Sequence, residues 1–189
     1  MTRPTHCHAV GFFAEVIMLK VKLDASSGFD AKEKSKLLSA IALLEKVVNS
    51  EEFRARVLNY TYNGNKTFVD NNGMSNELIY NLIMSGKEVL KPTEDHELNI
   101  NITIYSSFWN RNVIGYTYPN TLQTWINRRY YKNYTPADIC ANIAHEYLHK
   151  ASFNHSFAWT PSREFSVPYA IGYIVGELAR RNTLTPIQV

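Results

Sequence analysis

The segment HEYLHKASFNH, residues 145–155, gathers the side chains of this sequence that are best suited to chemistry. His145 and His149 are four residues apart, and in a helix this spacing places two side chains about 40° apart on one face, one turn from each other. Both imidazoles can therefore bind one metal ion. Glu146 follows the first histidine directly, where it can hold a water on the metal without being a ligand itself. The spacing predicts a hydrolytic zinc site.

A third ligand is required, because a catalytic zinc ion has three protein ligands and a fourth position open to water. His155 lies six residues after His149, too far to continue the same helical face but suited to a chain that leaves the helix and turns back. We therefore predict that His145, His149 and His155 bind Zn²⁺ and that Glu146 is the general base. The remaining histidines have no partner at ligand spacing and are interpreted as loop or tail residues: His6, His8 and His96.

The same segment resembles the metzincin signature H-E-x-x-H-x-x-G-x-x-H of zinc metallopeptidases. The resemblance implies the same three histidine ligands and the same glutamate base. It also implies a zincin-like α+β fold, with a twisted mixed sheet, a long backing helix, an active-site helix and a short helical C-terminal part. At the level of pattern the resemblance covers residues 95–181, and sequence identity is confined to the motif.

Two positions depart from the metzincin pattern. Ser152 replaces the glycine that lets the chain turn off the helix with positive φ, and Asn154, which tolerates that conformation better, is the alternative position for the turn. Residues 166–169, SVPY, are similar to the S-V-M-x-Y turn of some metzincins, with proline in place of methionine and the tyrosine one place early. The resemblance implies that Tyr169 binds zinc or stabilises the oxyanion; the alternative is a tyrosine packed at a helix start.

Two alternatives to this site remain open from the sequence. In a gluzincin-like arrangement a downstream glutamate, Glu177 or Glu164, would replace His155 as the third ligand. In a non-catalytic binding or structural module, zinc would only stabilise the fold, and such sites usually fill all four positions with protein ligands. The sequence has no cysteine near the three histidines and keeps Glu146, and both facts favour a peptidase.

Cap signals and helical periodicity predict the helices that position these residues. Asp30 and Glu33 form a capping box before a long amphipathic helix over about 31–49. A shorter helix is predicted over 75–87. Thr135-Pro136-Ala137-Asp138 is a strong helix start for the helix that carries the motif. A last helix is predicted over about 167–181, in which Gly172 and Gly176 allow a close approach to the metal site.

Four strands are predicted. Alternating apolar and polar residues over 98–104 indicate a half-buried strand, and further strands are expected over 53–62, 113–118 and 122–129. We expect a peptide or protein substrate to lie extended along an exposed strand edge formed by Val113, Ile114, Gly115 and Tyr116. Nearby aromatic side chains line substrate pockets or pack in the core: Trp109, Tyr116, Tyr118 and Trp159.

The composition fits a globular protein, with 45% apolar and 20% charged residues in 189. We expect residues 18–189 to form a single zincin-like catalytic domain with a cleft near 150–156, and residues 1–17 to be a tag or flexible arm. The basic cluster 128–132 is too short to indicate nucleic-acid binding, and Cys7 and Cys140 do not make a disulfide framework. No apolar run is long enough to span a membrane, and Glu15 interrupts the only leader-like stretch. The compartment and the oligomeric state do not follow from the sequence.

Overall fold

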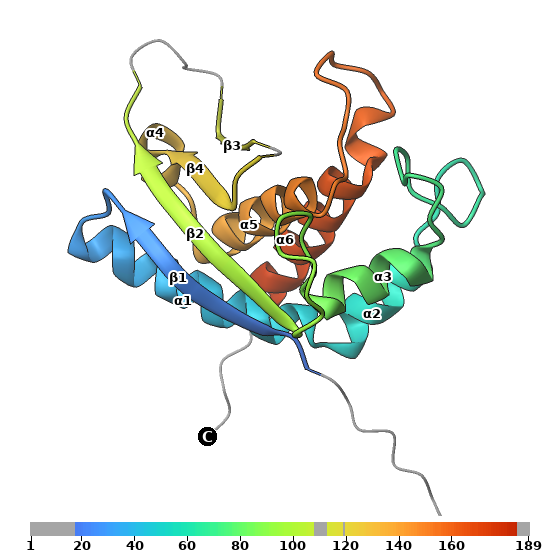
Figure 1. The fold of residues 1–189 in the computed structure, drawn as a ribbon, viewed down its shortest axis with the longest axis horizontal. Coiled ribbons are helices and arrows are strands. Elements are labelled where there is room, and N and C mark those ends of the chain that lie inside the picture. The colour runs from blue at the N-terminus through green and yellow to red at the C-terminus, as the bar shows by residue number, and fades with distance from the viewer. Residues whose placement is uncertain (1–17, 108–112, 119, 185–189) are drawn as a thin grey trace, which may run out of the picture.

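The computed structural model describes residues 18–107, 113–118 and 120–184. Within these ranges a four-stranded mixed sheet and six α-helices form an α+β fold (Figure 1). The strands are β1 (Lys20–Ser27), β2 (Glu97–Tyr105), β3 (Gly115–Thr117) and β4 (Gln123–Asn127). The helices are α1 (Ala31–Val48), α2 (Glu51–Leu58), α3 (Asn76–Ser85), α4 (Arg128–Tyr131), α5 (Pro136–Lys150) and α6 (Val167–Leu184), with a 3-10 turn η1 (Arg163–Phe165) before the last. The predicted α+β class with a mixed sheet is confirmed, while the predicted tag or arm, residues 1–17, and Trp109 lie outside the described residues.

The sheet has the strand order β1-β2-β4-β3. β1 and β4 flank β2 in parallel, and β3 pairs antiparallel with β4, so β3 is an edge strand. The sequence did not predict β1, whose sequence KVKLDASS ends in small and polar residues and whose pairing with β2 shifts register between Leu23 and Ala25. Long-range pairing with β2, not a strong local pattern, makes this segment a strand.

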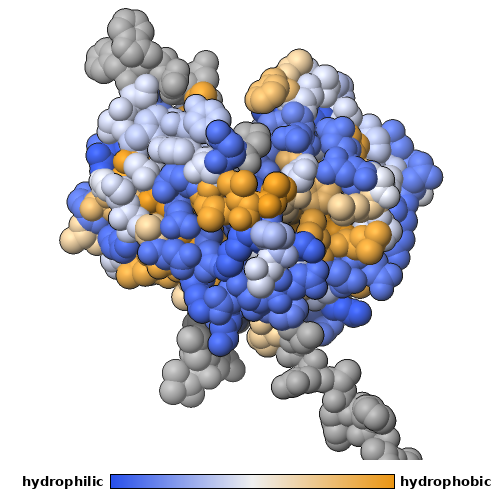
Figure 2. All heavy atoms as spheres, in the orientation of Figure 1, coloured by the Kyte–Doolittle hydropathy of each residue, from blue (hydrophilic) through white to orange (hydrophobic). Residues whose placement is uncertain are grey.

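The surface is hollowed between the part of the molecule that carries β3 and β4 and the part that carries residues 151–166 (Figure 2). Most of the surface in this view is hydrophilic, with separate apolar patches. None of the helices within the described ranges combines the length and apolar character needed to cross a bilayer.

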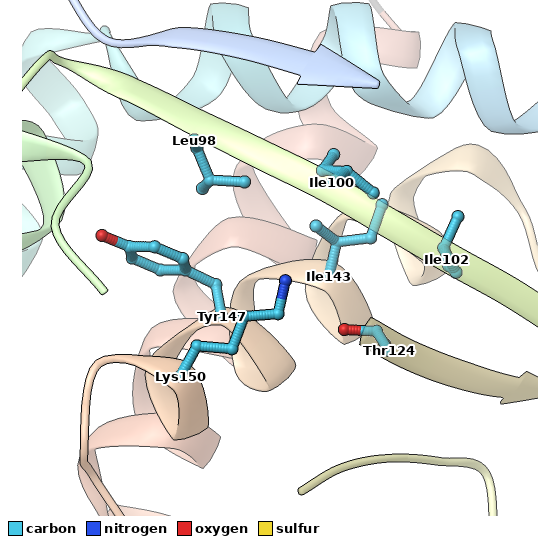
Figure 3. A pocket seen from close by; sticks show the side chains of 7 residues that line it. All are labelled: Leu98, Ile100, Ile102, Thr124, Ile143, Tyr147 and Lys150. Carbon is cyan, nitrogen blue, oxygen red and sulfur yellow. The ribbon is translucent and has the colours of Figure 1, made fainter. Parts of the chain in front are cut away.

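Helix α5 packs against β2 through apolar side chains. Figure 3 shows a small cavity between them, lined from β2 by Leu98, Ile100 and Ile102 and from α5 by Ile143, Tyr147 and Lys150. Helix α1 lies beside α5, where the buried thiol of Cys140 donates to the carbonyl oxygen of Ala40 at 3.1 Å. The core formed in this way fixes α5, the helix that carries the motif, between the sheet and its neighbouring helices.

A buried ion pair attaches the C-terminal end of α5 to the chain before β2. The Lys150 Nζ lies 3.9 Å from an oxygen of Glu88, and both side chains are almost fully buried. The Val89 amide donates to the Lys150 carbonyl at 2.9 Å, and the Tyr147 hydroxyl donates to the Lys87 carbonyl at 3.1 Å. These contacts fix the last turn of α5 just before the chain leaves the helix.

The helix starts that cap signals predicted are present. In α1 the Glu33 amide donates to Asp30 at 2.8 Å and the Asp30 amide donates to Glu33 at 3.0 Å. In α5 the amide of Asp138 donates to Thr135 at 3.2 Å and the amide of Thr135 donates to Asp138 at 3.0 Å. Helices α1, α3, α5 and α6 agree with their predicted ranges to within a few residues.

The predicted strand over 53–62 is wrong, because most of this segment forms α2. Ser50 caps the helix by accepting the Phe53 amide at 3.1 Å, and two acidic residues occupy the first turn. Phe53 and Val57, four residues apart, place their buried side chains on one helical face. The β-branched and aromatic residues of this segment therefore fill a helix interface and not a sheet.

The predicted strand over 122–129 ends earlier, at Asn127, and the chain then turns into α4. The Asn127 side chain caps α4 by accepting the Arg129 amide at 3.1 Å. Arg128 turns toward α1, where its Nε donates to Glu33 at 2.9 Å. The first arginine of the basic cluster thus stabilises the start of α1.

Candidate metal centre

The structure brings the three predicted histidine ligands together, and we call His145, His149 and His155 the histidine cluster. One ring nitrogen from each lies within 4.8 Å of the other two. The Nε2 atoms of His145 and His149 are 3.2 Å apart. Tetrahedral zinc with Zn–N bonds of about 2.0–2.1 Å separates two ligand nitrogens by about 3.3 Å, so this pair fits one shared ion.

Backbone carbonyls determine which nitrogen of each ring is available. The Nδ1–H of His149 donates to the Phe153 carbonyl at 2.8 Å, and the Nδ1–H of His155 donates to the Ser156 carbonyl at 3.0 Å. His145 is hydrogen-bonded to the Pro168 backbone. A ring whose Nδ1 carries the proton presents the Nε2 lone pair to a metal, and such outer hydrogen bonds also fix ring orientation.

The electrostatics of the cluster favour neutral imidazoles. Burial, together with the two neighbouring histidines, lowers the pKa of His145 to about 3. Burial also lowers the pKa of His149 and of His155, against the opposing effect of their backbone hydrogen bonds. Neutral rings have lone pairs, so the site is prepared for a cation at neutral pH.

A left-handed turn at Ser152 returns the chain to the histidine cluster. Ser152 has φ +77°, its amide donates to the His149 carbonyl at 3.1 Å, and its own carbonyl accepts the Asn72 side-chain amide at 3.0 Å. Asn154, the alternative position for this turn, is not among the described residues with positive φ. Phe153, which follows, is fully buried and fixes the loop that leads to His155. Of the two positions that the sequence left open for this turn, Ser152 therefore makes it and Asn154 does not.

Glu146 is buried between α5 and the edge strand β3. Its side chain is hydrogen-bonded to Thr117, and its second oxygen, Oε2, is buried with no hydrogen-bond partner among the described residues. Burial raises the pKa of this carboxyl to about 7, against the opposing effects of Thr117 and of the Lys150 ammonium. A carboxyl with a pKa near neutrality can both accept and release a proton at pH 7.

Tyr169 comes from the first turn of α6 and lies against the histidine cluster. Its ring centroid is 4.6 Å from that of His145 and 4.7 Å from that of His155. Burial raises the pKa of its hydroxyl, and the neighbouring Arg163 guanidinium acts in the opposite direction. The structure therefore brings Tyr169 to the site.

Helix α6 approaches α5 closely through glycine. A Cβ added at Gly172 would lie 3.1 Å from the Ala141 carbonyl oxygen and 3.5 Å from the His145 Cβ. A Cβ at Gly176 would lie 3.1 Å from the Ala141 Cβ. Because glycine has no side chain at these two positions, α6 can lie directly on the turn of α5 that carries His145.

The two alternative ligands lie outside the histidine cluster. Glu177, on α6, forms an ion pair with Arg56 of α2. Glu164 lies in η1 with an exposed side chain. Neither belongs to the group of residues whose ligand atoms converge.

The predicted substrate strand lies partly in β3. Gly115 and Tyr116 belong to β3, and Val113 and Ile114 precede it with exposed side chains. Tyr116 and Tyr118 pack on Trp125 of β4, with ring centroids 5.1 and 5.7 Å from it. These two tyrosines therefore cover the sheet, whereas Trp159 is 77% exposed in the loop after His155.

Sequence reasoning missed Thr117, Arg163 and the carbonyl partners of the histidines. Thr117 belongs to the predicted strand, but its contact with Glu146 depends on how β3 is placed over α5. Arg163 lies in a segment without periodicity, and its guanidinium carbon is 4.9 Å from the Tyr169 ring centroid. No spacing rule connects these residues to the motif.

Comparison of the sequence with protein-family models and with curated proteins found no match.

Proposed function

We propose that this protein is a zinc-dependent metallopeptidase, with a zincin-like fold and a metzincin-like site. The observation that carries the proposal is the convergence of three ring nitrogens beside a buried carboxylate. Imidazole ligands suit zinc, and three of them leave a fourth position for water and substrate. In this proposal His145, His149 and His155 hold the ion, and residues 18–189 provide the catalytic domain.

The buried carboxylate favours catalysis over a purely structural zinc site. Burying a carboxylate oxygen without a partner costs stability, and a site that only binds zinc gains nothing from it. Glu146 is 3% exposed and has such an oxygen. The arrangement is expected where a group must accept a proton from a water during the reaction.

Each residue of the site has a role in peptide hydrolysis. When bound, zinc polarises the scissile carbonyl and lowers the pKa of a water toward 7. Glu146 accepts the proton of that water at its carboxylate and passes it to the nitrogen of the leaving amine. The Tyr169 hydroxyl donates to the carbonyl oxygen as negative charge develops there.

The substrate binds along β3 in this proposal. β3 pairs with β4 on one side only, and no further strand of the described chain covers its other side. An extended peptide can pair with such an edge through main-chain hydrogen bonds. The side chain of Thr117 in β3 is hydrogen-bonded to Glu146. A peptide on this edge would therefore lie next to the proposed base.

The test combines metal analysis with digestion of a peptide library, with and without a chelator. We expect about one zinc per chain, cleavage that the chelator abolishes, and recovery when zinc is restored. Glu146→Gln should keep zinc and reduce turnover by a factor on the order of 10²–10⁴, the contribution typical of a general base. Glu164→Gln, an exposed neighbour, is the matched control and should keep both zinc and activity.

Two outcomes would contradict the proposal. Absence of zinc from a folded wild-type protein would remove the metal site. Bound zinc without cleavage of any library peptide would select the alternative, a zinc-stabilised binding module.

A further inference from the structure

Arg163 is a cation that lies one aromatic ring away from the histidine cluster. It belongs to η1, and its guanidinium carbon lies 4.9 Å from the centroid of the Tyr169 ring. The same ring contacts His145 and His155. The guanidinium and two of the three proposed ligands thus contact the same Tyr169 ring.

No acidic side chain neutralises this cation among the described residues. None of their ion pairs includes Arg163. Its Nε–H is buried and has no acceptor. Asp70 and Glu164 influence the charges of the same region, but both side chains are exposed and neither is paired with Arg163. A guanidinium with incomplete hydrogen bonding favours binding of an anion.

The charge of the site once zinc is bound points in the same direction. The imidazole ligands are neutral, so they do not balance the two positive charges of the ion. Arg163 adds a third positive charge, and Glu146 can offset at most one of the three. Positive charges gathered at one place attract anionic ligands.

We propose that Arg163 binds a carboxylate of the substrate, so that this protein prefers peptides with a carboxylate close to the scissile bond. The inference rests on the proposed function and specifies its substrate class. A planar guanidinium binds a carboxylate through two parallel hydrogen bonds. An extended peptide advances by about 3.3–3.6 Å per residue, so a carboxylate one or two residues from the scissile bond can span one tyrosine ring. Its source is either a free C-terminus or an acidic side chain.

The experiment measures binding of matched metal-chelating peptides to the zinc-loaded full chain. One pair of peptide hydroxamates differs only at the C-terminus, which is a carboxylate or a carboxamide. A second pair has an amidated C-terminus and differs by glutamate or glutamine beside the hydroxamate. We expect the carboxylate member of at least one pair to bind about 10–100-fold more tightly, and the pair that shows this identifies the source.

Variants of Arg163 then test whether this residue causes the preference. Arg163→Met keeps the length of the side chain but removes the charge, and it should reduce the ratio of the two dissociation constants to about one. Arg163→Lys keeps the charge without the planar fork and should give an intermediate ratio. Arg54→Met is the matched control, because Arg54 also stacks on a tyrosine, Tyr80, at 6.0 Å, and it should leave the ratio unchanged.

The outcomes separate this inference from the proposed function. Equal affinities within both pairs on the wild-type protein, or a preference that persists in Arg163→Met, would overturn the inference while hydroxamate binding still supports a metal site. If the chain does not take up zinc and none of the four compounds binds, the metal site itself is rejected. If Arg163→Met does not fold, Arg163→Lys and the wild-type ratios decide the question.

Discussion

Replacement of Ser152 by glycine should stabilise this protein, because serine occupies a backbone conformation there that glycine adopts without strain. Ser152 has φ +77° and an exposed side chain. An L-residue in the left-handed region costs about 1–2 kcal/mol of stability, which glycine would recover. The greater conformational freedom of glycine in the unfolded chain offsets about 0.4–1 kcal/mol of this gain. The hydrogen bond from Asn72 goes to the backbone carbonyl of residue 152 and is kept in the variant.

The expected net gain is about 0.5–1 kcal/mol in the free energy of unfolding. For a chain of this size the corresponding rise in Tm is about 1–4 °C. The assay is urea unfolding of the zinc-free protein, followed by tryptophan fluorescence. The matched control is Ser35→Gly in the interior of α1, which should destabilise by about 0.5 kcal/mol because glycine is a poorer helix former.

Zinc affinity provides a second readout of the same turn. Ser152→Gly keeps the turn and should keep zinc affinity, whereas Ser152→Val places a β-branched residue at positive φ and should weaken both stability and zinc binding. If glycine at position 152 destabilised the protein as much as glycine at position 35 does, the turn would not be strained and this reasoning would be wrong.

Four further predictions concern the proposed metal site. His155→Ala should weaken zinc binding at least tenfold, whereas Glu177→Ala should change it less than twofold, as measured by competition with a fluorescent chelator; the reverse ranking would favour the gluzincin-like arrangement. Zinc should stay bound as the pH falls below 6.5, because burial lowers the pKa of all three histidines, of His145 to about 3; release complete at pH 6 would contradict this. The zinc-free protein should lose stability as the pH falls from 6.5 toward 3. In this range the unfolded chain binds a proton at His145 that the folded protein excludes. An unfolding midpoint that does not change over this range would refute this prediction. Gly172→Val should cost about 1–3 kcal/mol of stability and weaken zinc binding, because the valine side chain would meet the Ala141 carbonyl. Urea unfolding measures the stability and zinc titration the affinity. A variant as stable as the wild type would exclude close packing at this position.

The parts of the site that lie within one helix could be predicted from the sequence. Helical periodicity alone places His145 and His149 on one face of α5, and Thr135 with Asp138 fixes where that helix begins. The capping box at Asp30 fixes the start of α1 in the same way. These features depend on residues three or four apart, so no knowledge of the rest of the chain is needed.

The segment 53–62 shows where local reasoning fails. Its β-branched and aromatic residues suit a strand or a buried helical face equally well. Ser50 as a cap and the burial of Phe53 and Val57 against neighbouring helices decide for a helix. β1 is the opposite case, since pairing with β2 makes a strand of a segment without a clear alternation.

The sequence by itself determined the chemistry available to this protein: two imidazoles on one helical face, a carboxylate beside them and a third imidazole within reach. Tertiary structure alone decided how these groups are oriented. The carbonyl oxygens that orient the rings of His149 and His155 belong to the loop after α5. Thr117 reaches Glu146 from β3, and Arg163 reaches Tyr169 from η1. The physical reason is that helix geometry repeats every 3.6 residues, whereas the path of a loop depends on the long-range contacts that hold it, such as the Asn72 side chain on the Ser152 carbonyl.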